Sequence, residues 1–228
     1  MREAFVSGSV RIKLCGIRSI DEGRAAVEAG ADLIGINFVP GSPRQVSIQT
    51  AVDICEALAG SGVERVALFR DASWEDIEHV LRRCDFDRVQ LHGQETEQEV
   101  EEIDLPVIKA IRGADLVAAE TYPGTILLLD HPSEGGGQGK SWDWSEASEL
   151  IANGHDVILA GGLTPENVEA ALRGVGDVLP WGVDCATGVE GAGYEKDPVK
   201  MRAFVEAVRK TEAAVAPEAG EGWVETPE

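Results

Sequence analysis

The sequence predicts a single-domain (β/α)8 barrel, and two observations carry this prediction. Short apolar runs recur eight times along the 228 residues, and a segment with the apolar spacing of an amphipathic helix follows each run. Strict alternation of strands and helices indicates a parallel sheet. Eight such units in about 200 residues fit a closed barrel better than an open sheet. No Gly-x-Gly-x-x-Gly motif follows the first run, which weakens a dinucleotide-binding alternative.

The predicted strands are rich in Val, Ile and Leu with few polar interruptions, as is typical of parallel strands that are buried on both faces. They are Val10–Cys15, Leu33–Phe38, Val63–Phe69, Val89–Leu91, Val107–Ala110, Ile126–Leu129, Val157–Ala160 and Trp181–Cys185.

The predicted helices have Ser, Thr or Asp near several starts, and the first ends at Gly30. They are Ser19–Gly30, Ser47–Ala59, Ser73–Cys84, Glu95–Ile103, Ala114–Thr121, Trp144–Asn153, Thr164–Leu172 and Pro198–Lys210. The barrel therefore occupies residues 1–210. Residues 211–228 are rich in Ala, Glu, Gly and Pro, and we interpret them as an acidic, mobile tail.

Composition and charge exclude some classes of partner and location. The net charge is −21, with only 20 Lys and Arg residues, so we expect no nucleic-acid partner, because binding phosphates needs clustered cations. An acidic, Lys-poor surface suits a cytosol with high salt, where the self-repulsion is screened, and we hypothesise a halophilic source. No apolar run reaches about 18 residues and the N-terminus lacks a signal-peptide core, so we expect a cytoplasmic protein with no membrane partner.

The four cysteines form no Cys-x-x-Cys pair, and no His lies at zinc-ligand spacing from them. They are interpreted as reduced, intracellular thiols, and no metal site is expected.

Polar residues fall where a barrel carries its chemistry, at the carboxyl ends of strands. They are Cys15, Arg44 in the loop after the second strand, His92, Asp130 and Asp184. Asp130 is the strongest signal, because a carboxylate directly after three leucines must find partners or lie at the barrel mouth. Taken singly, the others have plainer interpretations: a small core thiol, a surface arginine, a core histidine. Lys13 is expected to pair with Asp184 or another acid.

Glycines follow the seventh and eighth strands, which is the usual place for a phosphate in such barrels. Gly161 and Gly162 form one turn and Thr187 and Gly188 the other. Bare backbone N–H groups can approach an anion there, and a short helix starting near Val189 would add its positive end. A glycine-rich loop, Gly135–Lys140, follows the sixth strand.

Together these motifs resemble the phosphoribosylanthranilate isomerase family. The match covers residues 10–210, and its segments appear in one order. They are Lys13–Ile17, Ser42–Arg44, Val89–Gly93, Asp130 with its glycine-rich loop and Asp143-Trp144, Ala160–Val168, Val183–Glu190 and Lys196–Pro198. Two departures concern affinity: Ala186 stands where the family has a hydroxyl, and Gln138 where a small residue is common.

The resemblance implies an Amadori rearrangement in tryptophan biosynthesis, converting N-(5-phosphoribosyl)anthranilate to 1-(2-carboxyphenylamino)-1-deoxyribulose 5-phosphate. Cys15 is implied as the general base and Asp130 as the general acid. Arg44 is implied to hold the anthranilate carboxylate bidentately, and Gly161, Gly162, Thr187 and Gly188 to hold the phosphate. Asp184 and His92 have supporting roles.

For this chemistry we expect Asp130 to have a raised pKa and Cys15 a pKa near or below neutral, helped by Lys13. No cofactor is expected. The partner is a small phosphorylated substrate, and the chain is expected to be a monomer or a homodimer.

Other phosphate-binding barrels fit less well. An indole-glycerol-phosphate synthase needs a Glu partner for Lys13, a Schiff-base aldolase needs a Lys where Asp130 stands, and a thiamine-phosphate synthase needs a carboxylate cluster for magnesium. A bifunctional sugar isomerase would carry Asp where Cys15 stands. A barrel that only binds a phosphorylated ligand would require neither Cys15 nor Asp130.

Overall fold

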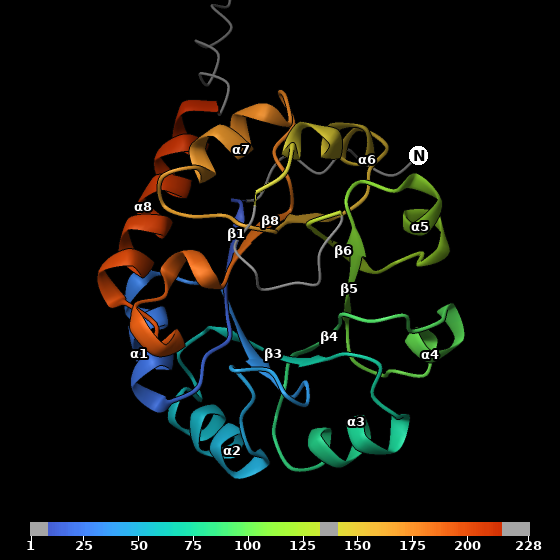
Figure 1. The fold of residues 1–228 in the computed structure, drawn as a ribbon, viewed down its shortest axis with the longest axis vertical. Coiled ribbons are helices and arrows are strands. Elements are labelled where there is room, and N and C mark those ends of the chain that lie inside the picture. The colour runs from blue at the N-terminus through green and yellow to red at the C-terminus, as the bar shows by residue number, and fades with distance from the viewer. Residues whose placement is uncertain (1–8, 133–140, 216–228) are drawn as a thin grey trace, which may run out of the picture.

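Eight parallel strands form a closed barrel. The computed structural model describes residues 9–132 and 141–215. The strands pair in chain order and β1 also pairs with β8, which confirms the predicted barrel (Figure 1). They are β1 Arg11–Cys15, β2 Leu33–Asn37, β3 Glu64–Phe69, β4 Arg88–Leu91, β5 Val107–Arg112, β6 Ile126–Asp130, β7 Val157–Leu159 and β8 Gly182–Cys185.

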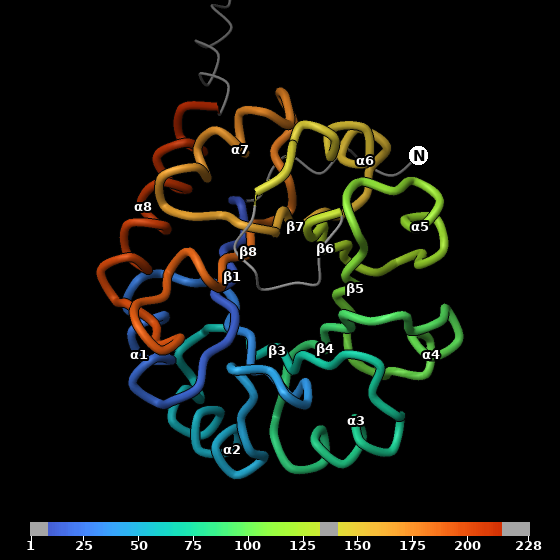
Figure 2. The backbone as a smooth tube through the Cα atoms, in the orientation of Figure 1, coloured from blue at the N-terminus to red at the C-terminus, as the bar shows by residue number. Residues whose placement is uncertain are grey.

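The helices surround the barrel, and the tube in Figure 2 shows the chain circling once until α8 lies beside α1. They are α1 Ile20–Ala29, α2 Ile48–Ala57, α3 Trp74–Leu81, α4 Glu97–Glu101, α5 Leu116–Thr121, α6 Ser148–Ala152, α7 Val168–Gly174 and α8 Pro198–Val215. A 3-10 turn, η1 (Trp144–Ala147), leads into α6.

Local sequence explains where the early helices begin. Ser19, Ser47 and Ser73 cap α1, α2 and α3, since each hydroxyl accepts a hydrogen bond from a backbone N–H in the first turn. Thr96 and Glu99 form a reciprocal capping box at α4. These caps set the entry of each helix after its strand.

The predicted start of the C-terminal tail at residue 211 is wrong. Helix α8 continues to Val215. Thr211 is buried, and its hydroxyl donates to the carbonyl of Ala207 one turn earlier at 2.8 Å, so this side chain belongs to the packed face of the helix. Residues 216–228 lie outside the part that the structure describes.

Alternating strand residues fill the barrel interior, as the two-residue period of a strand requires. The interior apolar cluster is Leu33, Val66, Ile108, Ala110, Ile126, Leu128, Ile158 and Ala160. A larger cluster lies between the strands and the helices and includes Ile12, Leu14, Ile34, Leu127 and Phe204.

The amino ends of the strands are closed by ion pairs. Glu64 accepts from Arg11 at 2.8 Å and also bonds Arg88. Both guanidinium groups lie over the ring of Trp181, at 5.3 and 5.5 Å from its centroid. These residues begin β1, β3 and β4 or precede β8, so their contacts cover the amino end of the barrel.

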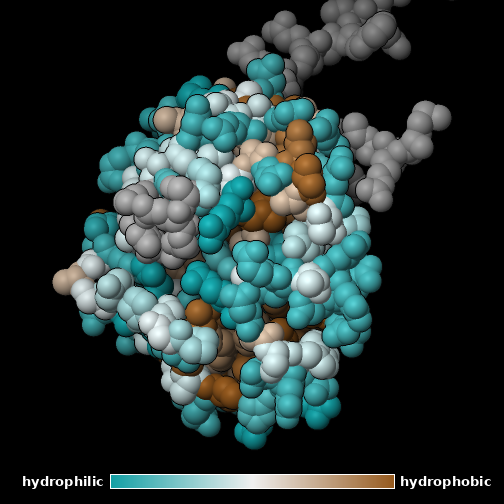
Figure 3. Space-filling model, turned by 45° about the vertical axis from the view of Figure 1, so that its right-hand side comes forward, coloured by the Kyte–Doolittle hydropathy of each residue, from teal (hydrophilic) through white to brown (hydrophobic). Residues whose placement is uncertain are grey.

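The visible surface is mostly hydrophilic, with apolar residues in small patches (Figure 3). None of the helices within residues 9–132 and 141–215 has the length and apolar character needed to cross a membrane.

Candidate active site

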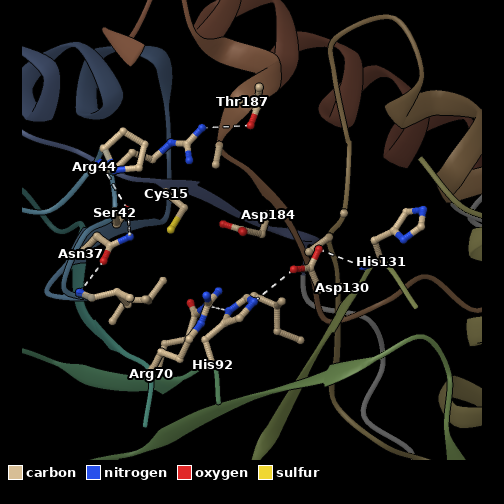
Figure 4. A pocket seen from close by; sticks show the side chains of 18 of the residues that line it. Cys15, Asn37, Ser42, Arg44, Arg70, His92, Asp130, His131, Asp184 and Thr187 are labelled. Atoms are coloured by element: carbon tan, nitrogen blue, oxygen red, sulfur yellow. Dashed lines mark hydrogen bonds and ion pairs between the residues drawn. The ribbon is translucent and has the colours of Figure 1, made fainter. Parts of the chain in front are cut away.

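A cavity of about 340 Å³ opens at the carboxyl ends of the strands. All nine residues predicted for the site line it, and Figure 4 shows the labelled side chains from several strands directed into it. They are Cys15, Arg44, His92, Asp130, Gly161, Gly162, Asp184, Thr187 and Gly188. The closed sheet brings them together from across most of the sequence.

Cys15 ends β1 beside a buried ion pair. Lys13 is fully buried, and its Nζ donates to Oδ1 of Asp184 at 2.8 Å, as predicted. Asp184 lies between Cys15 and Asp130 in the view of Figure 4. Because an isolated buried ammonium would be very costly, the Asp184 carboxylate is what permits Lys13 to remain charged beneath the thiol.

Gly35 on β2 makes room for this arrangement. A Cβ at Gly35 would lie 2.6 Å from Cys15 Sγ and 3.2 Å from Lys13 Nζ. Any larger side chain would therefore displace the thiol. The sequence analysis missed Gly35, because a glycine within an apolar strand carries no sign of which neighbours need the space.

The pKa of Cys15 differs from the expectation. Burial raises the pKa of the thiol, and the positive charge of Lys13 offsets this only in part. The Asp184 carboxylate raises the pKa further. The expected pKa near or below neutral is therefore wrong, and the thiol is protonated at neutral pH.

Asp130 ends β6 and also departs from the expectation. Burial alone would raise its pKa, but the hydrogen bond from His92 and the backbone N–H of His131 outweigh burial and lower the pKa below its ordinary value. The two hydrogen-bond distances are 3.1 and 2.9 Å. The carboxyl is therefore ionised at neutral pH, not partly protonated as predicted.

His92 connects Asp130 to a buried amide. Its Nδ1 lies 3.0 Å from Gln90 Nε2. With the amide donating to Nδ1, the proton on Nε2 is the one that His92 donates to Asp130. Among the described residues, Gln90 Oε1 is buried without a hydrogen-bond partner. Gln90 is a second residue that the sequence analysis missed, since it was quoted only as part of a motif.

The Arg44 side chain is buried and is already paired with a carboxylate of the protein. Its Nε and Nη2 donate to the carboxylate of Glu190 at 2.6 and 2.8 Å, and Nη2 also donates to Thr187 Oγ1 at 3.0 Å. The bidentate edge that was predicted for a ligand therefore faces Glu190. The loop before Arg44 is shaped by Asn37, whose amide donates to Ser42 Oγ at 3.2 Å and accepts from the backbone N–H of Val39.

Glu190 neutralises a second buried cation. Lys196 Nζ donates to Glu190 Oε1 at 2.7 Å and to the carbonyl of Ala186 at 3.0 Å. These two cations hold the pKa of Glu190 below its ordinary value, although burial acts against them. Neither Glu190 nor Lys196 was predicted as a site residue, because their contact with the site runs through Arg44, which comes from the loop after β2.

The turn after β7 presents bare backbone. Gly161 and Gly162 have φ of 75° and 80°, where other residues are strained. A Cβ on Gly161 would lie 2.8 Å from the backbone nitrogen of His131 and 3.0 Å from Asp130 Oδ1. The indole N–H groups of Trp142 and Trp144 both donate to the carbonyl of Ala160, at 3.0 and 2.8 Å, which fixes the start of this turn.

The turn after β8 is a 3-10 turn, Thr187–Val189, and the short helix expected from Val189 is not formed there. Thr187 and Gly188 still line the cavity, and their turn packs against the turn after β7, because a Cβ on Gly188 would clash with the carbonyl oxygen of Leu163. The glycine-rich loop, Gly135–Lys140, with Gln138, lies outside the described residues. Within the described ranges, no group of three or more His, Cys, Asp or Glu side chains is arranged to hold a metal ion.

Comparisons with known proteins agree with this geometry. The family model described as N-(5′-phosphoribosyl)anthranilate isomerase matches residues 12–207. An enzyme of that name from Pseudomonas fluorescens is 45% identical over 208 residues, which are 88% of this chain and 99% of the relative. One from Myxococcus xanthus is 40% identical over 209 residues, with 88% and 97% covered.

A solved structure gives the same result. The crystal structure of phosphoribosyl anthranilate isomerase from Thermus thermophilus superposes with a TM-score of 0.80 at 35% identity, covering 88% of this chain and 99% of that one. The likeness thus extends over the whole barrel, in sequence and in fold. The chain belongs to the N-(5′-phosphoribosyl)anthranilate isomerase family.

Proposed function

We propose that this chain converts N-(5′-phosphoribosyl)anthranilate to 1-(2-carboxyphenylamino)-1-deoxyribulose 5-phosphate, with Cys15 as base and Asp130 as acid. The observation that carries the proposal is their position in one cavity, beside an arginine and two glycine-rich turns. A barrel that only binds its ligand would need neither a thiol nor a carboxyl there. The direct test is a turnover assay that follows the loss of anthranilate fluorescence.

The two acidic groups of the substrate would be held by neighbouring parts of the cavity rim, since Arg44 Nη2 donates to Thr187 Oγ1 at 3.0 Å. The phosphate would accept hydrogen bonds from the backbone of Gly161, Gly162 and Gly188 and from Thr187. The anthranilate carboxylate would lie on Arg44. Because Nε and Nη2 of Arg44 are engaged by Glu190 and Thr187, we assign the carboxylate to Nη1.

The reaction then needs two proton transfers at the sugar. Protonated Asp130 gives its proton to the furanose oxygen, and the bond from that oxygen to C1′ breaks, leaving a Schiff base with the anthranilate nitrogen. The Cys15 thiolate removes the proton on C2′ to form an enolamine. In the tautomerisation that follows, C1′ takes a proton and the C2′ hydroxyl releases one, so acid and base return to their starting states.

The pKa values impose a condition on this mechanism. At neutral pH the main form of the free site has Asp130 ionised and Cys15 protonated. The reactive form has one proton moved from Cys15 to Asp130, so both forms hold the same number of protons and their ratio does not depend on pH. A bound phosphate and carboxylate favour protonation of Asp130, because negative charges raise its pKa.

His92 would assist by holding the Asp130 carboxyl in place. Its Nε2 lies 3.1 Å from Asp130 Oδ2, and its Nδ1 lies 3.0 Å from Gln90 Nε2, so the ring is fixed on both sides.

Removal of either proton-transfer group should nearly abolish turnover. We expect Cys15→Ala and Asp130→Asn each to lower kcat by at least about 10²-fold, which is the low end for a positioned acid or base. Steady-state kinetics with the fluorescence assay measure this. Cys55→Ala removes a buried thiol on α2, outside the cavity, and should leave kcat nearly unchanged. A near-normal rate for Cys15→Ala would eliminate the assigned base.

Gly35→Ala should inactivate the enzyme without unfolding it. The added methyl group would displace Cys15 Sγ, and a misplacement of about 1 Å can cost about 10²-fold in rate. The matched control is Gly174→Ala, where the nearest atom to an added Cβ is 3.9 Å away. Thermal denaturation should show both variants folded, and kcat should fall only in the first. Equal rates would mean that the thiol position does not matter.

The pH profile should distinguish the two protonation schemes. For the wild type we expect kcat/KM to stay constant within about threefold from pH 6.5 to 8, a range above the phosphate pKa of about 6. The low pKa of Asp130 and the raised pKa of Cys15 place both limbs outside this window. In Asp130→Asn the compensating proton is lost, so residual activity should rise about tenfold per pH unit. A wild-type profile that rises as steeply would contradict the proposed pairing.

We also propose that the protein works in a cytoplasm of high salt. Its net charge of −21 on 228 residues supports this, because self-repulsion at this density is relieved when the Debye length falls to about 3 Å at 1 M salt. Between 0.1 and 2 M KCl, the melting temperature and kcat/KM should both rise, the former by several degrees. Equimolar sorbitol is the uncharged control. Values that fall with KCl would exclude adaptation to salt.

A further inference from the structure

Tyr194 adopts a backbone conformation that bulky residues avoid. Its φ is 64°, in the left-handed region. Glycine occupies this region freely and asparagine does so with little cost, whereas a tyrosine is strained there. Such strain persists only where the surrounding structure imposes it, and it concentrates at ligand-binding positions.

The loop that carries Tyr194 is held firmly at its base. An antiparallel bridge joins Glu190 to Lys196, and the backbone N–H of Gly191 donates to the carbonyl of Glu195 at 2.8 Å. Arg18 Nη2 donates to the carbonyl of Gly193 at 3.2 Å. The side chains of Glu190 and Lys196 also form an ion pair at 2.7 Å, which joins the two ends of the loop a second time. The loop therefore fixes the direction in which the Tyr194 ring projects.

The ring lines the cavity and stacks on Arg44. The Arg44 guanidinium carbon lies 5.3 Å from the ring centroid, and Tyr194 is 48% exposed, so about half of this large side chain is free to contact a ligand. The neighbouring cavity wall is also apolar, because Val39, Pro40 and Pro43 come from the loop that leads to Arg44. An aromatic ring beside an arginine and a proline-rich wall suits a ligand that is itself aromatic and carries an acid group.

We propose that Tyr194 recognises the aryl ring of the substrate by packing against it, while Arg44 takes the carboxylate of the same ring. The inference rests on the proposed function for the identity of the ring. The strained backbone is retained because the loop directs this ring to the one place where the benzoate of the substrate must lie when its carboxylate is on Arg44. Tyr194 is thus a binding residue that selects for an aryl group on the sugar.

The test uses two substitutions in the full chain. Tyr194→Asn keeps a residue that tolerates the left-handed backbone and removes the ring, and Tyr194→Phe keeps the ring and removes the hydroxyl. Three competitive inhibitors are compared. They are the reduced product analogue with its carboxyphenylamino group, the same compound without the carboxylate, and ribitol 5-phosphate, which has no aryl group.

We expect Tyr194→Asn to weaken both aryl inhibitors by about five- to twentyfold, as loss of an aromatic contact and its buried area implies. Ribitol 5-phosphate should bind within about twofold of the wild type. KM for the substrate should rise in parallel while kcat changes less than about threefold, and Tyr194→Phe should resemble the wild type in every measurement.

Three results would overturn the inference. Unchanged affinity for the aryl inhibitors would show that the ring makes no contact. Equal weakening of ribitol 5-phosphate would indicate a general disturbance of the loop. Weakening of only the carboxylated inhibitor would mean that Tyr194 acts by positioning Arg44. The proposed function has its own test: a wild type that binds the aryl inhibitors without turning over the substrate would refute it. The inhibitor affinities of the two variants would still test the Tyr194 contact in that case.

Discussion

Closure of the sheet through the pairing of β1 with β8 is the constraint on which the site depends. Parallel strands all end on one side, so closure directs eight carboxyl ends to a single rim. Cys15 and Asp184 become neighbours although 169 positions separate them in the chain, since β1 and β8 are adjacent. Glu64, two arginines and Trp181 pack together at the opposite rim, and the cavity lies at the carboxyl ends of the strands.

Buried charges then organise that rim. Lys13 pairs with Asp184, and Glu190 pairs with both Arg44 and Lys196. Removing one partner of such a pair typically costs about 3–5 kcal/mol, because the other charge is left buried and alone. Of these pairs, Arg44 with Glu190 ties the loop after β2 to the loop after β8. Arg44 is consequently held in place before a ligand binds, which reduces the conformational entropy that its side chain loses on binding.

The same burial sets the proton chemistry. It raises the pKa of Cys15, while hydrogen bonds to the carboxylate lower that of Asp130. The proposed base, Cys15, and the proposed acid, Asp130, thus rest in the opposite protonation states from those in which they would react. A single proton transfer between them restores the reactive state, so the resting arrangement is compatible with catalysis. Because the thiol and the carboxyl line one cavity, this proton transfer can take place within it.

By itself, the sequence determined the fold class and the positions of the strands. Runs of Val, Ile and Leu separated by amphipathic segments are local patterns, so they can be recognised without knowing the tertiary contacts. It also indicated the nine cavity residues, because polar and glycine residues stand out when they follow apolar strands.

The tertiary structure decided the rest. That Arg44 faces Glu190, that Gly35 clears space for the Cys15 thiol, and that Tyr194 lies over Arg44 are all contacts between segments distant in the chain. The pKa directions of Cys15 and Asp130 likewise follow from burial and from partners on other strands, and both sequence-based expectations were wrong. The type of a residue shows in the sequence which chemistry its side chain can perform. Its electrostatic environment and its neighbours are set only when the barrel has closed.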